Sequence, residues 1–386
     1  MKKKFLEKIS IIKKKFKDKK IYLHEPSILK DDIASVIKAL KEKEVSTYGK
    51  YTRIFESKIS QFIKNNNVIS VINGTSALHL ALKMLNVKKG TEVLVPSLTF
   101  VSTVNAIIYN GAEPHFIEAD SKNLSVDILK LDSYLKKITF KKNNKTFNKK
   151  TKKEIKYLIL VHLNGLCCDI SLLKKTLKKY RIGLIEDAAE AFGSYYKKKH
   201  LGTYGEVGIF SFNGNKIFTT GGGGAIVFKN KGLYKKGLSY ASNCKKIVSN
   251  ETDYVDVGYN YRMPSLNASL GISQVKKINI FKNKKKNIYN FYKKIFLKDP
   301  LIKLLAPQEN VDSNYWLNTI MIKDNKFINK KKLTFLFKKN NIHVRSVWKP
   351  LHLIGRYKNF QSMSLKQTEK IYSQTITLPS SPFLWK

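Results

Sequence analysis

The stretch FSFNGNKIFTTGGGG, residues 210–224, places one lysine, Lys216, between a short apolar run and four consecutive glycines. The chain has 73 lysine and arginine residues among 386, so a lysine alone carries little information. The setting distinguishes Lys216, because glycines let the backbone approach a ligand closely and Ser211 supplies a hydroxyl nearby. We therefore regard Lys216 as a candidate reactive amine.

Apolar runs alternate with segments of helical periodicity along the chain to either side of Lys216. Residues 67–85, NVISVINGTSALHLALKML, predict a strand, a glycine turn and a helix, and residues 92–111 repeat this plan. Further strands are predicted in EPHFIEAD, YLILVHLNG, IGLIEDAAEAFG, VGIFSFNG and GAIVFKN. This alternation predicts an α/β fold, with a mostly parallel sheet flanked by helices.

The pattern changes near residue 270. Residues 272–296, ISQVKKINIFKNKKKNIYNFYKKIF, predict one long helix, and the apolar runs that follow predict a smaller C-terminal α+β domain. We therefore expect a basic N-terminal tail at 1–20, a large domain at 21–270 and a small domain at 271–386.

The formal net charge is +45, and almost all of the excess comes from lysine. Such a charge attracts nucleic acid, anionic membranes or acidic substrates. The lysines are nevertheless spread along the chain among asparagines, which indicates a general compositional preference. Residues 1–20 and 136–156 are the most basic segments, and we expect a solvated amphipathic tail and a basic surface insertion there. We expect no specific nucleic-acid partner, because no helix-turn-helix segment or aromatic-basic platform is evident.

Targeting and metal signals are missing from the sequence. No apolar stretch is long enough to span a bilayer, and the start of the chain does not read as a secretory signal. The cysteines, Cys167, Cys168 and Cys244, are odd in number and lack zinc-ligand spacing. We therefore expect a cytoplasmic protein without a metal site.

The carboxyl ends of parallel strands are where ligands bind, so the residues that follow each strand are the candidates. Gly74 permits a sharp turn, and Thr75 and Ser76 then stand at a helix N-terminus, which favours a phosphate. Taken alone, that feature is also an ordinary helix cap. Phe100 follows the next strand, where it can lie flat against an aromatic ligand or belong to the core.

Acidic residues complete the set of candidates. Glu186 and Asp187 directly follow the apolar run IGLI, and Glu190 comes three residues after Asp187, although acids here can simply cap a helix. Pyridoxal 5'-phosphate requires a site that binds its phosphate, an aromatic side chain against its ring, a carboxylate beside its ring nitrogen and a lysine amine for the Schiff base. Their combination, more than any one of them, predicts this cofactor.

The chain resembles the DegT/StrS-type sugar aminotransferases, a family of fold-type I enzymes that depend on pyridoxal phosphate. The likeness covers nearly everything after the basic tail. Within the family, SFNGNKI, LHEP and VWKPLH resemble the subgroup that aminates UDP-linked 4-keto-6-deoxy-N-acetylhexosamines in bacillosamine- and legionaminate-type pathways. The matching segments are YLHEP, STYGKYTRIFESKI, NGTSALHLAL, PSLTFVSTVNAI, VHLNG, IEDAAEAFGS, FSFNGNKIFTTGGGGAIV, GYNYRMPSLNASLG and VRSVWKPLH.

The resemblance implies a role for each candidate in a large domain that binds pyridoxal phosphate. Lys216 would hold the cofactor as a Schiff base, Asp187 would pair with its ring nitrogen, Phe100 would stack on the ring and Glu190 would lie near its 3-hydroxyl. The phosphate would be held by Gly74, Thr75, Ser76 and Ser211, and by Asn260 from a neighbouring subunit.

Several consequences of the resemblance concern residues that differ or whose role is less defined. The contribution of Asn260 implies a homodimer with shared active sites. His162 matches a recurrent family histidine, although a purely structural role is the simpler interpretation. Many members have glutamine at the position of Glu190, and many have an acid within the run of four glycines.

The implied activity is a ping-pong transfer of an amino group from an amino acid, with glutamate expected, to a nucleotide-linked keto sugar. One alternative is a dehydratase of the same family, in which histidine replaces the Schiff-base lysine, and Lys216 argues against it. Another is a regulatory or nucleic-acid-binding protein on the same scaffold, which the net charge of +45 suggests.

Overall fold

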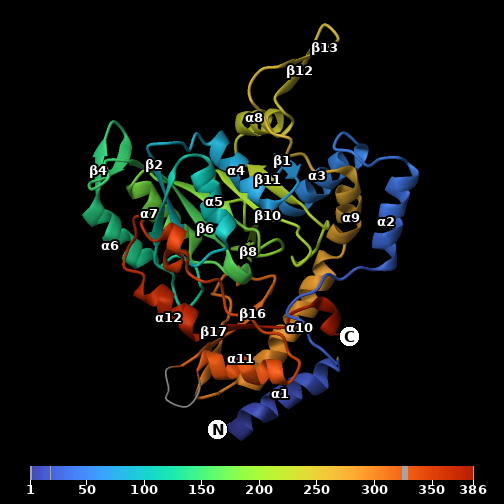
Figure 1. Cartoon of the computed structure of the whole chain (residues 1–386), viewed down its shortest axis with the longest axis vertical. Helices are drawn as coiled ribbons and strands as arrows, with labels where there is room; N and C mark the ends of the chain where they lie inside the picture. The colour runs from blue at the N-terminus through green and yellow to red at the C-terminus, as the bar shows by residue number, and fades with distance from the viewer. Residues whose placement is uncertain (1, 18, 324–328, 386) are drawn as a thin grey trace.

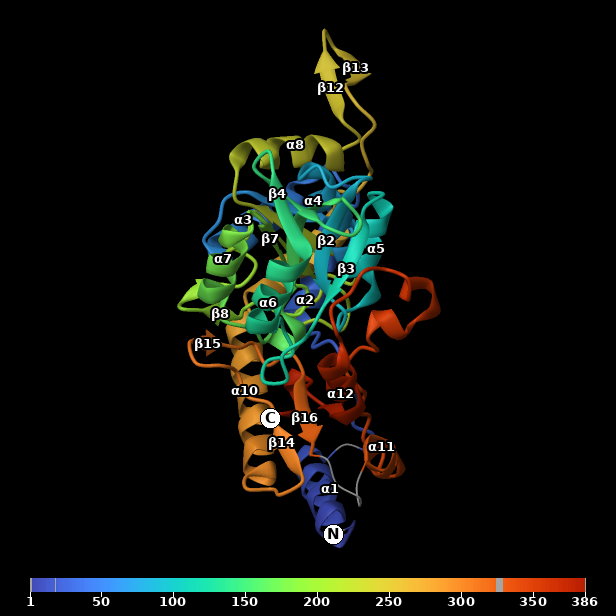
Figure 2. The ribbon, with the colours of Figure 1, turned by 90° about the vertical axis from the view of Figure 1, so that its left-hand side faces the viewer.

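A large sheet lies in the wide part of the molecule, and a small sheet lies at its narrow end beside α10, α11 and α1 (Figure 1). The structure is a computed structural model that describes residues 2–17, 19–323 and 329–385. Helix α10 (Ile278–Phe296) runs from the wide part to the narrow end and connects the two in both views (Figure 2).

The strands of the large sheet follow the order β1-β11-β10-β7-β6-β2-β3. The pairs from β10 to β3 are parallel, whereas β11 runs antiparallel to both of its neighbours. Apolar residues line both faces, as expected for a sheet covered by helices on each side. The strands are β1 (Val68–Val71), β2 (Thr91–Pro96), β3 (Glu113–Ile117), β6 (Glu154–Val161), β7 (Gly183–Asp187), β10 (Val207–Ser211) and β11 (Gly224–Phe228).

Helices cover both faces of this sheet, which confirms the predicted α/β class. The helices α4, α5 and α8 pack on one face, and α3, α6, α7 and α9 pack on the other, where α9 also contacts α2. These helices are α2 (Lys30–Lys41), α3 (Lys50–Ile63), α4 (Gly74–Met84), α5 (Val101–Tyr109), α6 (Ile128–Ile138), α7 (Ile170–Lys179), α8 (Lys231–Ala241) and α9 (Ser265–Val275).

The small sheet is antiparallel, in the order β14-β16-β17, and packs against α1, α10 and α11. The prediction of one helix at 272–296 is wrong. Residues 276 and 277 separate α9 from α10, because α9 packs on α2 and α3 while α10 continues toward the small sheet. The expected division at 270/271 falls inside α9 and stays a prediction. The elements of this region are β14 (Ile302–Leu304), β16 (Asn318–Ile322), α11 (Lys330–Lys339), α12 (Lys366–Gln374) and β17 (Thr375–Leu378).

The N-terminal segment is a folded helix rather than the expected solvated tail. Helix α1 (Lys2–Phe16) buries Phe5, Ile9, Ile12 and Phe16 in the core around the small sheet. These residues recur at intervals of three and four, so they form one apolar face while many of the lysines lie on the solvent side. The amphipathic pattern was recognised in the sequence, but the surface that covers it was not.

Hairpins extend outward from the wide part of the molecule. The β4–β5 hairpin (Thr139–Lys142, Lys145–Asn148) forms the middle of the expected 136–156 surface insertion and pairs with β6. The β12–β13 hairpin (Lys245–Val248, Glu251–Tyr254) extends far beyond α8 (Figures 1 and 2). A short sheet of β8 (Tyr195–Tyr196), β9 (Lys199–His200) and β15 (Val311–Asp312) lies at the surface, and short 3-10 turns occur at Leu163–Gly165, Leu351–Leu353, Gly355–Tyr357 and Pro382–Leu384.

Within the described ranges, no helix combines the length and apolar character needed to cross a bilayer. The same residues contain no cluster of three or more histidine, cysteine or acidic side chains suited to a metal ion.

Candidate active site

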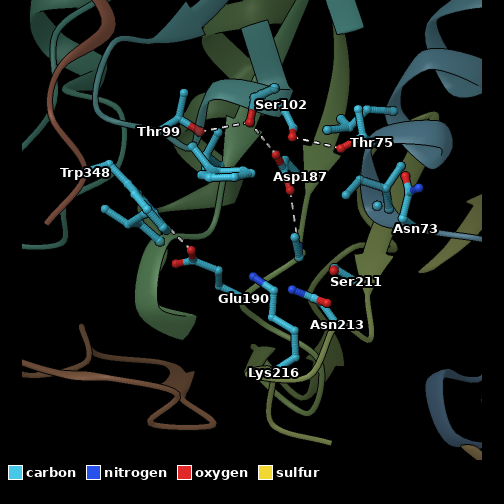
Figure 3. Close-up of a pocket in the computed structure, with 18 of the residues that line it drawn as sticks. Asn73, Thr75, Thr99, Ser102, Asp187, Glu190, Ser211, Asn213, Lys216 and Trp348 are labelled. Atoms are coloured by element: carbon cyan, nitrogen blue, oxygen red, sulfur yellow. Dashed lines mark hydrogen bonds between the residues drawn. The ribbon is translucent and has the colours of Figure 1, made fainter. Parts of the chain in front are cut away.

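A cavity of about 230 Å³ opens at the carboxyl ends of β1, β2, β7 and β10. It collects most of the candidate residues from distant parts of the chain (Figure 3). The candidates that line it are Gly74, Thr75, Phe100, Asp187, Glu190, Ser211 and Lys216. The parallel strands explain this meeting, because their carboxyl ends share one edge of the sheet.

Asp187 is the last residue of β7 and is buried in the floor of the cavity. Its Oδ2 accepts a hydrogen bond from the Thr103 hydroxyl at 2.7 Å, and its Oδ1 accepts one from the Ala189 amide at 3.2 Å. Burial raises the pKa of the carboxyl, and these hydrogen bonds and the amine of Lys216 oppose the shift. A cation placed in the cavity would therefore be stabilised by a carboxylate whose orientation is already set.

Glu190 lies in the loop that follows β7 and is also buried. Its Oε2 accepts a hydrogen bond from the Asn164 amide at 2.8 Å, and its Oε1 accepts one from the Trp348 indole at 3.2 Å. Burial raises its pKa, and Lys216 is the strongest opposing influence. Both carboxylate oxygens thus serve as acceptors, which a glutamine at this position could not reproduce.

Lys216 lies in the loop between β10 and β11, and its amine points toward Glu190 (Figure 3). Its Nζ is 4.5 Å from the ring centroid of Trp316. Burial lowers the pKa of the amine, while the negative charges of Glu190 and Asp187 raise it. Among the described residues, no ion pair joins this amine to a carboxylate. A buried amine with a lowered pKa is more readily neutral and therefore more nucleophilic.

The N-terminus of α4 forms the other end of the cavity. Asn73 caps the helix by accepting a hydrogen bond from the Ser76 amide at 2.8 Å, and the Thr75 hydroxyl donates to Ser102 at 2.8 Å. A Cβ added to Gly74 would lie 3.1 Å from the Ser211 Cβ, so glycine keeps this narrow space open. The first amides of a helix lack intrahelical partners and attract anions. These features fit a phosphate group.

Phe100 lies immediately before α5 and is 47% exposed. Its ring centroid is 4.8 Å from that of Trp348, with an interplanar angle of 53°. Phe100 therefore belongs to the wall of the cavity and not to the core, which was the alternative for an aromatic residue at this position.

The structure places three predicted residues away from the cavity wall. Ser76 is buried one residue further along α4, with its amide bonded to Asn73. The buried His162 pairs its Nε2 with Glu186 at 2.9 Å. Asn260 is exposed where the β12–β13 arm returns to the body, opposite Ser242. A single chain therefore does not bring Asn260 to its own cavity.

Sequence reasoning missed further lining residues. Ser102 and Thr103 follow Phe100 in α5, where helical spacing from the strand end could have indicated them. Trp316 and Trp348 come from the C-terminal region and carried no local signal. The residues that line the cavity but were not predicted include Asn73, Thr99, Ser102, Thr103, Asn213, Asn215, Trp316 and Trp348.

A half-buried lysine, two buried carboxylates and a helix N-terminus at the edge of a mostly parallel sheet define a pyridoxal-phosphate enzyme of the aminotransferase type. Residues 26–386 match the DegT/DnrJ/EryC1/StrS aminotransferase family, and the chain belongs to it. The protein is therefore a sugar aminotransferase that uses pyridoxal 5'-phosphate, as the sequence predicted.

Individual relatives agree with this assignment. The chain is 33% identical to the GDP-perosamine synthase of Escherichia coli O157:H7 over 367 residues, covering 95% of this chain and 94% of the relative. It is 31% identical to the UDP-4-amino-4,6-dideoxy-N-acetyl-beta-L-altrosamine transaminase of Campylobacter jejuni serotype O:23/36, covering 93% and 91%. The solved structure of Helicobacter pylori PseC, an aminotransferase involved in the biosynthesis of pseudoaminic acid, superimposes with a TM-score of 0.84 at 25% identity, covering 93% of each chain.

Proposed function

We propose that the enzyme transfers the amino group of L-glutamate to C4 of a UDP-linked 4-keto-6-deoxy-N-acetylhexosamine in the cytoplasm. The observation that carries the aminotransferase chemistry is the placement of Lys216 in one cavity with Asp187, Glu190 and the N-terminus of α4. The choice of sugar rests on the motifs SFNGNKI, LHEP and VWKPLH and on the similarity to the Campylobacter transaminases.

The residues of the cavity have complementary tasks in this proposal. The N-terminus of α4, with Gly74 and Thr75, would hold the phosphate of the cofactor together with Ser211, whereas the expected contact from Ser76 is not part of this proposal because Ser76 lies away from the cavity wall. Phe100 would lie against the ring, and Glu190 would accept a hydrogen bond from its 3-hydroxyl. When bound, pyridoxal phosphate supplies an electron sink for the carbon that loses a proton.

Lys216 and Asp187 would handle the protons. The Lys216 amine would remove a proton from the carbon that bears the transferred nitrogen and deliver one to the carbon on the other side of that nitrogen, which is a 1,3-proton shift. Asp187 would keep a proton on the ring nitrogen, because its carboxylate favours the charged form. The buried surroundings strengthen both electrostatic effects.

We further propose a homodimer in which Asn260 of the partner subunit completes the phosphate site. The β12–β13 arm and its return segment expose apolar side chains, with Ile247 at 70% and Val257 at 83% exposure. Exposed apolar groups on a projecting hairpin favour association. A second copy of this chain would both cover these side chains and bring Asn260 to a cavity.

A GDP-linked keto sugar is the second candidate substrate. It is favoured by the 33% identity to the GDP-perosamine synthase of Escherichia coli. Single-turnover assays with UDP-, GDP- and dTDP-linked keto sugars would separate the candidates, and conversion of only the GDP-linked sugar would overturn our choice.

The activity is tested by adding L-glutamate to the enzyme loaded with cofactor. We expect the absorbance band of the bound pyridoxal form to disappear, and borohydride reduction before glutamate should attach the cofactor to the peptide containing Lys216. Lys216→Ala should abolish both results, whereas Lys229→Ala, which removes an exposed lysine, should change neither. Attachment at another lysine would refute the assignment.

The same experiment addresses the two rival activities. A dehydratase would release water from the sugar without consuming glutamate. A regulatory protein would leave the absorbance band unchanged in the presence of glutamate and the keto sugar.

A further inference from the structure

Trp316 is a buried aromatic residue of the cavity wall that the chemistry proposed above does not use. It stands just before β16 and is 1% exposed. Its indole Nε1 donates a hydrogen bond to the Asn215 carbonyl at 2.7 Å, and its ring centroid lies 4.5 Å from the Nζ of Lys216. One side chain therefore contacts both the backbone before Lys216 and the Lys216 amine.

The hydrogen bond to Asn215 restrains the loop that carries Lys216. In this loop the Lys216 amide donates to the Asn213 carbonyl at 3.0 Å, which forms a turn. The carbonyl of Asn215 and the amide of Lys216 share one planar peptide group. Fixing that carbonyl therefore also fixes the plane from which the Lys216 side chain extends.

The backbone of Trp316 is itself held by buried polar side chains. Its carbonyl accepts a hydrogen bond from the Lys285 Nζ at 3.0 Å, and its amide donates to the Asn314 Oδ1 at 2.9 Å. Lys285, in α10, is 0% exposed, and no carboxylate among the described residues acts on its charge. A lysine is almost never fully buried without a paired acid. Its amine serves here as a fixed donor for the segment that carries Trp316.

The same segment reaches the loop that carries Glu190. The Asn314 Nδ2 donates to the carbonyls of Glu190 and Phe192, both at 3.0 Å. Residues 314–316 thus connect the Glu190 loop with the Lys216 loop, and the Lys216 amine points toward Glu190 (Figure 3). The relative position of these two groups depends on this connection.

We propose that Trp316 is a positioning residue for Lys216: its indole N–H holds the loop, and its ring face holds the amine whenever this amine is not bonded to the cofactor. This inference rests on the role proposed above for Lys216. The ring face of tryptophan attracts an ammonium group, whereas the flexible stem of a free lysine would otherwise sample many positions. An amine that moves protons must stay within reach of the reacting carbons.

Two substitutions separate the two contacts. Trp316→Phe removes the indole N–H but keeps an aromatic face, whereas Trp316→Leu removes both and keeps an apolar side chain. Trp385→Leu is the matched control, because Trp385 packs beside Phe291 and Lys15 around the small sheet and does not line the cavity.

The loop contact is tested by amide hydrogen exchange of the apoenzyme. We expect residues 213–217 to exchange about 3- to 10-fold faster in both Trp316 variants, because each loses one hydrogen bond, and to be unchanged in Trp385→Leu. Unchanged exchange in Trp316→Phe would overturn the proposal. An equal increase throughout the chain would indicate general destabilisation and would also count against a local role.

The amine contact is tested by competitive acetylation of Lys216 in the apoenzyme over a range of pH, since only the neutral amine reacts. The ring face favours the charged amine, so the midpoint of labelling should move about 0.5–1 pH unit lower in Trp316→Leu. Trp316→Phe should recover most of this shift. Equal midpoints in the wild type and Trp316→Leu would refute the contact. The other groups that act on the charge of this amine, which all variants keep, are Glu190, Asp187, Arg345 and His24.

Turnover provides the third test. At saturating glutamate we expect Trp316→Leu to slow the glutamate half-reaction about 10- to 100-fold, with a larger isotope effect from deuterium on the α-carbon, because proton removal becomes slower. A loss that disappears at saturating glutamate would assign Trp316 to donor binding instead and overturn the proposal.

Failure of this inference can be distinguished from failure of the proposed function. If the wild type does not react with glutamate, the proposed function is refuted, while exchange and labelling need no turnover and still test the contacts. A reacting wild type with unaffected Trp316 variants refutes only this inference. If Trp316→Leu does not fold, the exchange of the Lys216 loop in Trp316→Phe decides.

Discussion

Gly74→Ala should separate the stability of this enzyme from its affinity for the cofactor. Gly74 is the first residue of α4, where alanine is a better helix former than glycine by up to about 1 kcal/mol. The new Cβ would nevertheless lie 3.1 Å from the Ser211 Cβ and 3.4 Å from its Oγ, inside the proposed phosphate site. The apoenzyme should therefore be as stable as the wild type or slightly more stable, while cofactor binding is impaired.

The size of the binding defect follows from the hydrogen bonds at risk. A hydrogen bond to a charged group contributes about 1.5–3 kcal/mol. If the Cβ displaces the phosphate enough to remove one such bond, the affinity for pyridoxal phosphate should fall roughly 10- to 150-fold. The contact most directly affected is the one between the phosphate and the Ser211 hydroxyl, because the added Cβ would displace this hydroxyl.

The assay combines fluorescence titration of the apoenzyme with pyridoxal phosphate and thermal unfolding of the apoenzyme. Gly355→Ala is the matched control, because a Cβ there meets nothing within 4 Å, and it should change neither measurement. Unchanged affinity in Gly74→Ala would show that the phosphate does not bind at the N-terminus of α4. A large loss of apoenzyme stability would refute the packing argument instead.

Three further predictions concern the carboxylate, the subunit arrangement and the N-terminus. Asp187→Asn should bind cofactor but turn over about 1000-fold more slowly, as expected for losing a charge pair of about 4 kcal/mol. The charge of Asp187 also raises the pKa of Lys216, so in this variant the reaction of the apoenzyme with pyridoxal phosphate should reach its high-pH plateau at a lower pH. An unshifted pH profile would contradict the assignment. Mixed dimers of Lys216→Ala and Asn260→Ala chains should recover activity through one intact site, and confirmed mixed dimers without recovery would exclude shared sites. Ile12→Ala should destabilise the region around α1 by about 2–5 kcal/mol, measured by hydrogen exchange, because the Ile12 side chain is only 1% exposed. Ile11→Ala should have little effect, because the Ile11 side chain is 50% exposed. Equal effects of the two substitutions would show that α1 is a solvated tail.

The arrangement of the sheet and its strand-end residues could be predicted because both depend on local sequence. An apolar run followed by a turn residue specifies where a strand ends, and parallel pairing brings all such ends to one edge. Asp187 ends a strand, and Gly74 and Lys216 closely follow one, so their convergence could be predicted without knowledge of long-range packing. The family resemblance added the expected roles to these positions.

Contacts between distant segments could not be predicted in the same way. Trp316 and Trp348 reach the cavity only because the small sheet packs beside the large one, and no sequence periodicity near them indicates that packing. The burial of α1 is similar, since an amphipathic helix specifies an apolar face but not the surface that covers it.

The sequence by itself therefore determined the fold class, the cofactor chemistry and the candidate lysine, carboxylates and phosphate turn. Only the tertiary structure decided that Phe100 belongs to the cavity wall, that both oxygens of Glu190 are engaged, and that Asn260 lies away from the cavity of its own chain. The physical reason is that strand ends are set by neighbours in the chain, whereas burial and hydrogen-bond partners depend on which surfaces meet after the chain has folded.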